Sequence, residues 1–146
     1  MLLLCATVLA EAGQQAPAAN RRVPHSCSVT DRQFVQVARL DVESVDSLAQ
    51  DYLDGRAKAA DVASAAQDAA AWAADTEPTD PSLGIARRYL RAMFLEYAKA
   101  VRIRAAHGDA AQTMYRAYDM EEQVHDTLQP ARATLARLGC DVGELL

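Results

Sequence analysis

The sequence predicts a single all-α domain: an up-down-up-down four-helix bundle closed by a disulfide between the start of the first helix and the end of the last. Alanine is the first reason, because 31 of the 146 residues are alanine, which has the highest helix propensity. The second is that 6 glycines and 5 prolines are too few for the many turns of an all-β fold. The third is that four stretches of helical periodicity are joined by short connections, which favours antiparallel neighbours.

The first ten residues, MLLLCATVLA, form an uncharged apolar run that is too short to span a bilayer. A polar stretch rich in small residues follows, so we expect residues 1–12 to be an export signal that is cut after Ala10 or Ala12. No basic residue precedes the run, as expected if the true start codon lies upstream. The alternative is a frayed extension of the first helix. Residues 13–29 are then expected to be a disordered leader, and residues 30–146 the folded domain, with no transmembrane span in the mature chain.

The cysteines support both the predicted export and the predicted bundle topology. Loss of the export signal would remove Cys5 and leave Cys27 and Cys140, which lie just before the first predicted helix and just after the last. In an oxidising compartment, an even pair of cysteines predicts a disulfide. Without export, two unrelated thiols are the better interpretation. An up-down-up-down bundle brings these two chain positions to the same end, so the pairing needs no further assumption.

The expected helices cover residues 31–54, 57–75, 81–107 and 109–138. A capping box of Thr30 and Gln33 is expected to begin the first, Asp80 with Pro81 the third, and Asp109 the fourth. Glycines are expected to end the first, third and fourth helices, at Gly55, Gly108 and Gly139.

Two residues modify this pattern. Pro130 lies inside the fourth expected helix and predicts a kink or a short restart there. Trp72 lies on the alanine face of the second helix, where we expect it to fill the space that small side chains leave. The alternative for Trp72 is that it lines a ligand cavity.

The sequence contains no established catalytic motif, and we expect a protein that is not an enzyme. A ferritin-like di-iron site would need two Glu-x-x-His motifs, and only Glu122 and His125 form one.

A polar cluster is predicted inside the bundle. Asp41 falls within the apolar arc of the first helix, and Glu121 and His125 fall at the edge of the apolar arc of the fourth, one turn apart. Counted from the two cysteines, Asp41 and His125 lie at nearly the same height. The favoured interpretation is a network of hydrogen bonds and ion pairs that fixes helix register. The alternative is a mononuclear site for zinc or iron, which bind histidine and carboxylate ligands.

The third expected helix is strongly basic. Residues 82–107 contain six basic side chains and one acidic, whereas the whole chain has a net charge of −5. Five of the basic side chains share one side of the helical wheel: Arg87, Arg88, Arg91, Lys99 and Arg102. Such a stripe suits an anionic envelope polymer, lipid headgroups or an acidic protein. The alternative is a solvated face that the acidic first and fourth helices partly balance.

Nucleic acid is not an expected partner, because the chain is acidic overall and no aromatic residues interleave with the basic stripe. Arginine outnumbers lysine 13 to 2 and alanine is abundant, which indicates a GC-rich bacterial genome. Taken together, the sequence favours an exported, non-enzymatic binding module of the bacterial cell envelope that contacts its partner through the basic stripe. The competing hypothesis is a bundle that binds a small ligand or a metal at Asp41, Glu121 and His125.

Overall fold

A computed structural model describes residues 27–145, and within this range the protein is all-helical, with no β-strand. None of the helices described is long and apolar enough to cross a membrane. The predicted export signal and most of the predicted leader lie outside the described residues. The elements in chain order are α1 (Val29–Leu53), α2 (Ala59–Asp75), α3 (Pro81–Ala105), α4 (Ala111–Leu128), α5 (Arg132–Leu138) and the short 3-10 helix η1 (Gly143–Leu145).

The first helix begins earlier than the sequence predicts, because a different capping box forms. Ser28 is the N-cap, and its hydroxyl accepts a hydrogen bond from the Asp31 backbone N–H at 3.0 Å. The Asp31 carboxylate in turn accepts one from the Ser28 backbone N–H at 3.2 Å. The predicted box of Thr30 and Gln33 is therefore wrong, since Ser28 and Asp31 satisfy each other's backbone N–H groups two residues earlier.

The other helix boundaries lie within a few residues of those predicted. Asp80 caps α3 by accepting hydrogen bonds from the backbone N–H groups of Ser82 and Leu83, and Pro81 occupies the first turn. The chain leaves α3 through His107, which takes a left-handed conformation with φ of 59°. The next residue is Gly108, and a larger residue would not fit there, because its Cβ would lie 2.8 Å from Cγ2 of Ile103.

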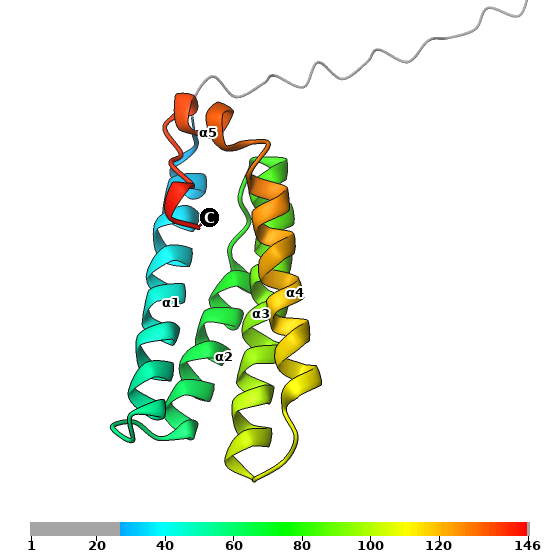
Figure 1. Ribbon diagram of the computed structural model, residues 1–146. Helices are drawn as coiled ribbons and strands as arrows, with labels where there is room; N and C mark the ends of the chain where they lie inside the picture. Colours follow the sequence, from blue (N-terminus) through cyan, green and yellow to red (C-terminus); the bar gives the residue numbers. More distant parts are fainter. Residues whose placement is uncertain (1–26, 146) are drawn as a thin grey trace, which may run out of the picture.

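The fourth predicted helix is divided in two at Pro130, as its sequence indicates. α4 ends at Leu128, a turn follows, and the short α5 carries the chain to Gly139, whose φ of 91° ends that helix. Cys140 comes next and forms the predicted disulfide with Cys27, with Cα atoms 5.5 Å apart. The disulfide thus joins the start of α1 to the residues after α5, at the end of the molecule where α5 lies (Figure 1).

The four longer helices lie side by side, and successive ones run in opposite directions (Figure 1). Packing is most extensive between α2 and α3 and between α3 and α4. α1 packs on α2 and on η1 but makes little direct contact with α4. Small side chains on α2 permit close approach of its neighbours, and Trp72 stacks on Phe34 of α1 with ring centroids 5.8 Å apart.

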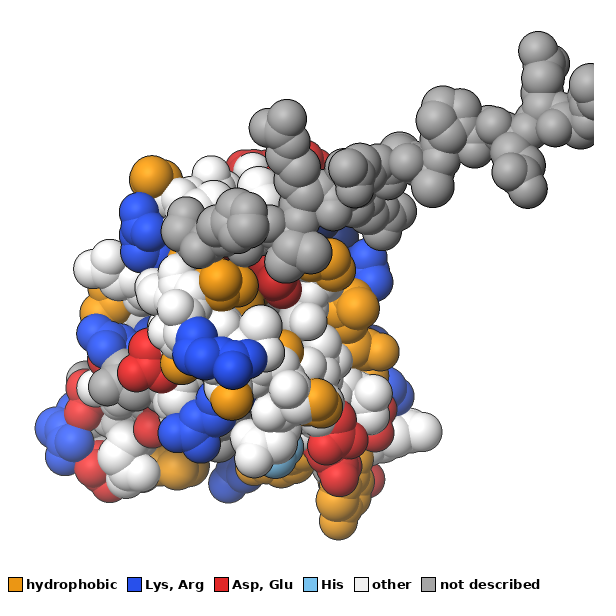
Figure 2. Space-filling view, turned by 90° about the horizontal axis from the view of Figure 1, so that it is seen from above, with side chains coloured by type: hydrophobic (Ala, Val, Ile, Leu, Met, Phe, Trp, Pro, Cys, Tyr) orange, Lys and Arg blue, Asp and Glu red, His pale blue; other side chains and the backbone are white. Residues whose placement is uncertain are grey.

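The surface at the disulfide end carries both signs of charge. Lysine and arginine side chains are interspersed there with aspartate and glutamate where the surface is visible (Figure 2).

Candidate functional site

The structure does not bring together the three residues of the predicted polar cluster. Glu121 and His125 are exposed on α4, whereas Asp41 is half-buried on α1. His125 Nδ1 lies 3.7 Å from a carboxylate oxygen of its neighbour Asp126. Among the described residues, no three histidine, cysteine, aspartate or glutamate side chains lie close enough together to hold a metal ion.

Asp41 lies apart from Glu121 and His125 because of the position of α1 relative to α4. The predicted cluster requires these two helices to pack directly, but α4 packs on α3 and makes little contact with α1. Within residues 27–145 as described, the Asp41 Oδ2 atom is consequently buried without a hydrogen-bond partner. Burial raises the pKa of the Asp41 carboxyl, as expected for an unpaired acid that loses water.

The space between α1 and α4 is instead a groove whose floor is α3. We call it the α1–α4 groove. It consists of two adjoining cavities, of about 390 Å³ and about 240 Å³, that share Val42, Met93, Tyr118 and Glu121. Its other lining residues include Val45 and Asp46 from α1, Leu90, Phe94 and Tyr97 from α3, Ala117, Glu122, Val124 and His125 from α4, and Leu145. Two members of the predicted cluster, Glu121 and His125, therefore line this groove.

The groove is apolar at its floor and acidic at its rim. Leu90, Phe94 and Val124 are buried, while Asp46 and Glu121 are exposed on the two opposite helices. Burial raises the pKa of Tyr97, and the nearby Asp46 carboxylate and Tyr118 add to that rise. The tyrosine hydroxyl therefore lies in a negative electrostatic field.

The predicted basic stripe divides into two parts in the structure. Arg87 and Arg102 are bound to α2. Arg87 donates hydrogen bonds to the carbonyl oxygens of Ala74 and Thr76 at the C-terminal end of that helix, and Arg102 donates to the Gln67 side chain. These two guanidinium groups stabilise the contact between α2 and α3.

The rest of the stripe faces solvent, and we call it the α3 basic surface. It comprises Arg88, Arg91 and Lys99, which are all exposed and form no ion pair with another described residue. A hollow of about 320 Å³ lies at the end of α2, lined by Ala73, Ala74, Arg88 and Arg91 and also by Arg87. No ion pair between described residues joins this surface to the acidic α1 or α4. Arg116 of α4 pairs instead with Glu96 of α3.

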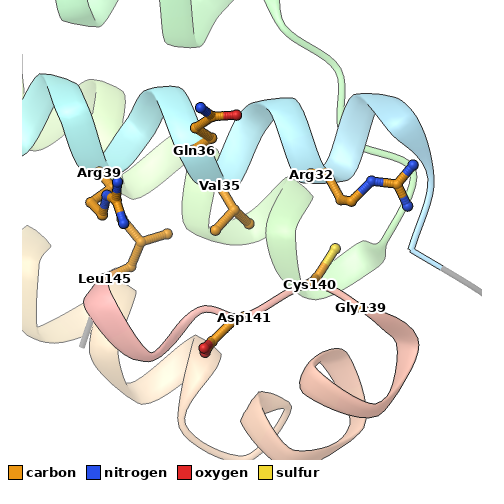
Figure 3. A pocket seen from close by; sticks show the side chains of 8 residues that line it. All are labelled: Arg32, Val35, Gln36, Arg39, Gly139, Cys140, Asp141 and Leu145. Atoms are coloured by element: carbon orange, nitrogen blue, oxygen red, sulfur yellow. The ribbon is translucent and has the colours of Figure 1, made fainter.

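A third cavity, of about 410 Å³, lies beside the disulfide between α1 and residues 139–145 (Figure 3). Arg32 and Arg39 line it from α1. Arg32 donates a hydrogen bond of 2.7 Å to the Cys27 carbonyl oxygen, and Arg39 lies 3.6 Å from the Glu43 carboxylate. Both guanidinium groups therefore contribute to local structure at this end of α1.

No known protein family, curated protein or solved structure matches this chain. Its function has to follow from its own grooves and charged surfaces.

Proposed function

We propose that this protein is an exported, non-enzymatic helical binding module of the bacterial cell envelope. In this proposal it folds as an up-down-up-down four-helix bundle and binds an anionic component of the envelope through the α3 basic surface. The observation that carries the proposal is that Arg88, Arg91 and Lys99 are exposed and unpaired among the described residues, although the chain is acidic overall.

The arrangement of helices supports the bundle topology. The four longer helices alternate in direction (Figure 1), and short connections join consecutive ones. In such a bundle α1 would close the ring of helices beside α4, and the α1–α4 groove is the incompletely closed side.

The cysteines and the N-terminal sequence support export. A disulfide that connects residues 113 apart is typical of proteins that fold in an oxidising compartment. The apolar run before residue 12 is typical of an export signal. If the proposal is correct, the protein recovered from the periplasm or medium of a bacterial host lacks these residues and contains the intact disulfide, as mass spectrometry would report.

The charge of α3 supports an anionic partner. Three unpaired cations on one side of one helix attract anions over about 10 Å at moderate ionic strength. Near an anionic membrane, each such cation contributes about 1 kcal/mol to binding. The attraction depends on salt, which gives it a simple experimental signature.

The test is to reverse these three charges together, as Arg88→Glu, Arg91→Glu and Lys99→Glu. Binding of the purified protein to phosphatidylglycerol vesicles and to the soluble polyanion heparin is measured at low and high salt. We expect wild-type binding to at least one probe, weakened by salt and reduced at least about tenfold by the triple reversal.

The matched control reverses three exposed cations elsewhere: Lys58, Arg104 and Arg137. It produces the same change in net charge, so equal losses in both variants would indicate a nonspecific effect of total charge. That outcome, or wild-type protein that binds neither probe, would contradict the proposed role of the α3 basic surface.

A further inference from the structure

The α1–α4 groove is separate from the α3 basic surface and has a different chemistry. α1 and α4 form its two sides, and α3 forms its floor. Neither of its cavities is lined by a lysine or an arginine. This is notable because the chain contains 15 such residues.

One half of the groove is apolar at its base and polar at its α4 edge. It lies toward Leu145, with Leu90 and Met93 at its floor and Val42 and Val124 at its sides. Glu121, Glu122 and His125 line its edge on α4. Its volume of about 390 Å³ lies within the range of cavities that hold small organic molecules, roughly 300–1,000 Å³. A hydrocarbon body of several carbons would be sheltered there from water.

The other half combines aromatic rings with carboxylates. Tyr97 rises from the floor, Tyr118 lies on α4, and Asp46 and Glu121 approach from opposite sides. No described cation forms an ion pair with either carboxylate. Aromatic faces and unpaired carboxylates together are the groups that proteins use to bind organic ammonium ions.

We propose that the α1–α4 groove binds a hydrophobic organic cation, with its apolar body over Leu90, Met93 and Val124 and its ammonium group between Asp46 and Glu121, against Tyr97 and Tyr118. The site does not depend on the proposed function of the α3 basic surface, and either can fail alone.

The dimensions of the groove favour a small molecule over a long helix. Its lining residues on α4 extend from Ala117 to His125, a distance of about 12 Å at 1.5 Å per residue. A symmetric contact with the groove of a second copy is disfavoured, because it would bring another acidic rim against Asp46 and Glu121.

The electrostatic field at Tyr97 agrees with this assignment. Burial is the largest cause of the raised Tyr97 pKa, and charge on Asp46 and on Tyr118 adds to it. The contribution of the Asp46 carboxylate favours a cation beside Tyr97. The charge of a bound ammonium group should therefore lower the Tyr97 pKa, against the opposing effect of further burial by the ligand.

The test uses octyltrimethylammonium as the probe, below its critical micelle concentration, with isothermal titration calorimetry of the full chain. Octyl sulfate has the same tail with the opposite charge, and tetramethylammonium has the same head without the tail. We expect octyltrimethylammonium to bind with one-to-one stoichiometry and both comparison compounds to bind at least about tenfold more weakly.

The variant for the same test is Asp46→Asn combined with Glu121→Gln. Both side chains are exposed, so the fold should be retained, which circular dichroism checks. We expect roughly tenfold weaker binding of octyltrimethylammonium, because two favourable charge interactions are lost. The matched control combines Glu43→Gln and Asp119→Asn, which removes one exposed carboxylate from each of the same two helices outside the groove.

A second readout is the ultraviolet titration of tyrosine with and without the probe, in wild type and in Tyr97→Phe. We expect a downward pKa shift on binding that disappears in Tyr97→Phe. Octyl sulfate that binds as tightly as octyltrimethylammonium, or equal binding by the groove and control variants, would overturn the proposal. A dimer in sedimentation analysis that is lost in the groove variant would overturn it as well, and would assign the groove to a second copy of the chain.

Discussion

Asp31 in α1 binds Thr79 of the α2–α3 connection through both of its carboxylate oxygens. One oxygen accepts a hydrogen bond from the Thr79 backbone N–H and the other from the Thr79 hydroxyl, each at 2.6 Å. The backbone N–H of Asp80 donates to the same carboxylate at 3.1 Å. The Asp31 residue is only 1% exposed, and it connects chain segments 48 residues apart. A buried charge is tolerated here because several donors surround it.

The first prediction is that Asp31→Asn destabilises the fold by about 2–3 kcal/mol, since charge-assisted hydrogen bonds are lost and an amide N–H₂ faces other donors. Urea unfolding followed by fluorescence of Trp72, the single tryptophan, measures this directly. Gln33→Ala, an exposed change in the same turn, should leave stability within about 0.5 kcal/mol of wild type.

The pH dependence of stability gives an independent prediction for Asp31. Burial alone would raise the Asp31 pKa, but hydrogen bonds from Thr79, Ser28 and Asp80 hold it below the ordinary value of 3.8. A lowered pKa means that the stabilisation is fully present above pH 3.8 and is lost as the pH falls through the depressed value. Wild type should therefore lose more stability in acid than Asp31→Asn. Parallel stability curves for the two proteins would contradict this assignment.

The sequence alone does not predict this contact. Local patterns identify a hydroxyl and a side chain three residues later, and both Thr30 with Gln33 and Ser28 with Asp31 satisfy that spacing. The second pair forms because Asp31 gains further hydrogen bonds from Thr79. That gain depends on a chain segment that only the tertiary structure brings near.

The helices themselves were largely predictable, because their signals are local. Alanine content, the Asp80 cap with Pro81, the interruption at Pro130 and the left-handed Gly139 each act within one or two turns. The candidate site was only partly predictable. Periodicity identifies the apolar face of a helix but not the helix that covers it. As a result, Glu121 and His125 line a groove together with Val42 of α1. Asp41, the residue before Val42 in the chain, does not line that groove.

The second prediction concerns the disulfide. Cys27→Ser combined with Cys140→Ser should destabilise the protein by about 3–5 kcal/mol, because the bond restricts a long loop of the unfolded chain. A reducing agent should lower the urea midpoint of wild type to that of the double variant and leave the variant unchanged. A midpoint that the reducing agent does not alter in wild type would contradict a stabilising role for this bond.

The third prediction is that Asp41→Leu stabilises the protein by about 1 kcal/mol at neutral pH, since it replaces a carboxylate that has no partner among the described residues and lies in an apolar arc. Burial raises the Asp41 pKa, so ionisation of this group lowers stability as the pH rises through the raised value. Asparagine does not titrate, so the free energy of unfolding of Asp41→Asn should exceed that of wild type most at neutral pH. Below pH 3.8 the two values should differ little. Urea unfolding at both pH values measures the difference, and equal gains at both would show that the charge of Asp41 is not responsible.

The fourth prediction separates the structural and the exposed arginines of α3. Arg87→Ala should destabilise the protein by about 1–2 kcal/mol, because the carbonyl oxygens of Ala74 and Thr76 lose their donor at the end of α2. Arg88→Ala removes a neighbouring exposed side chain and should change stability by no more than about 0.5 kcal/mol.

For binding to an anionic probe, we expect Arg88→Ala to have the larger effect and Arg87→Ala the smaller. There Arg88→Ala should weaken the interaction, whereas Arg87→Ala should change it little while the protein remains folded, since the Arg87 guanidinium is already bound to α2. Urea unfolding and vesicle binding of both variants provide the two measurements. Equal effects of the two substitutions in both assays would mean that the α3 basic surface includes Arg87, contrary to its position against α2.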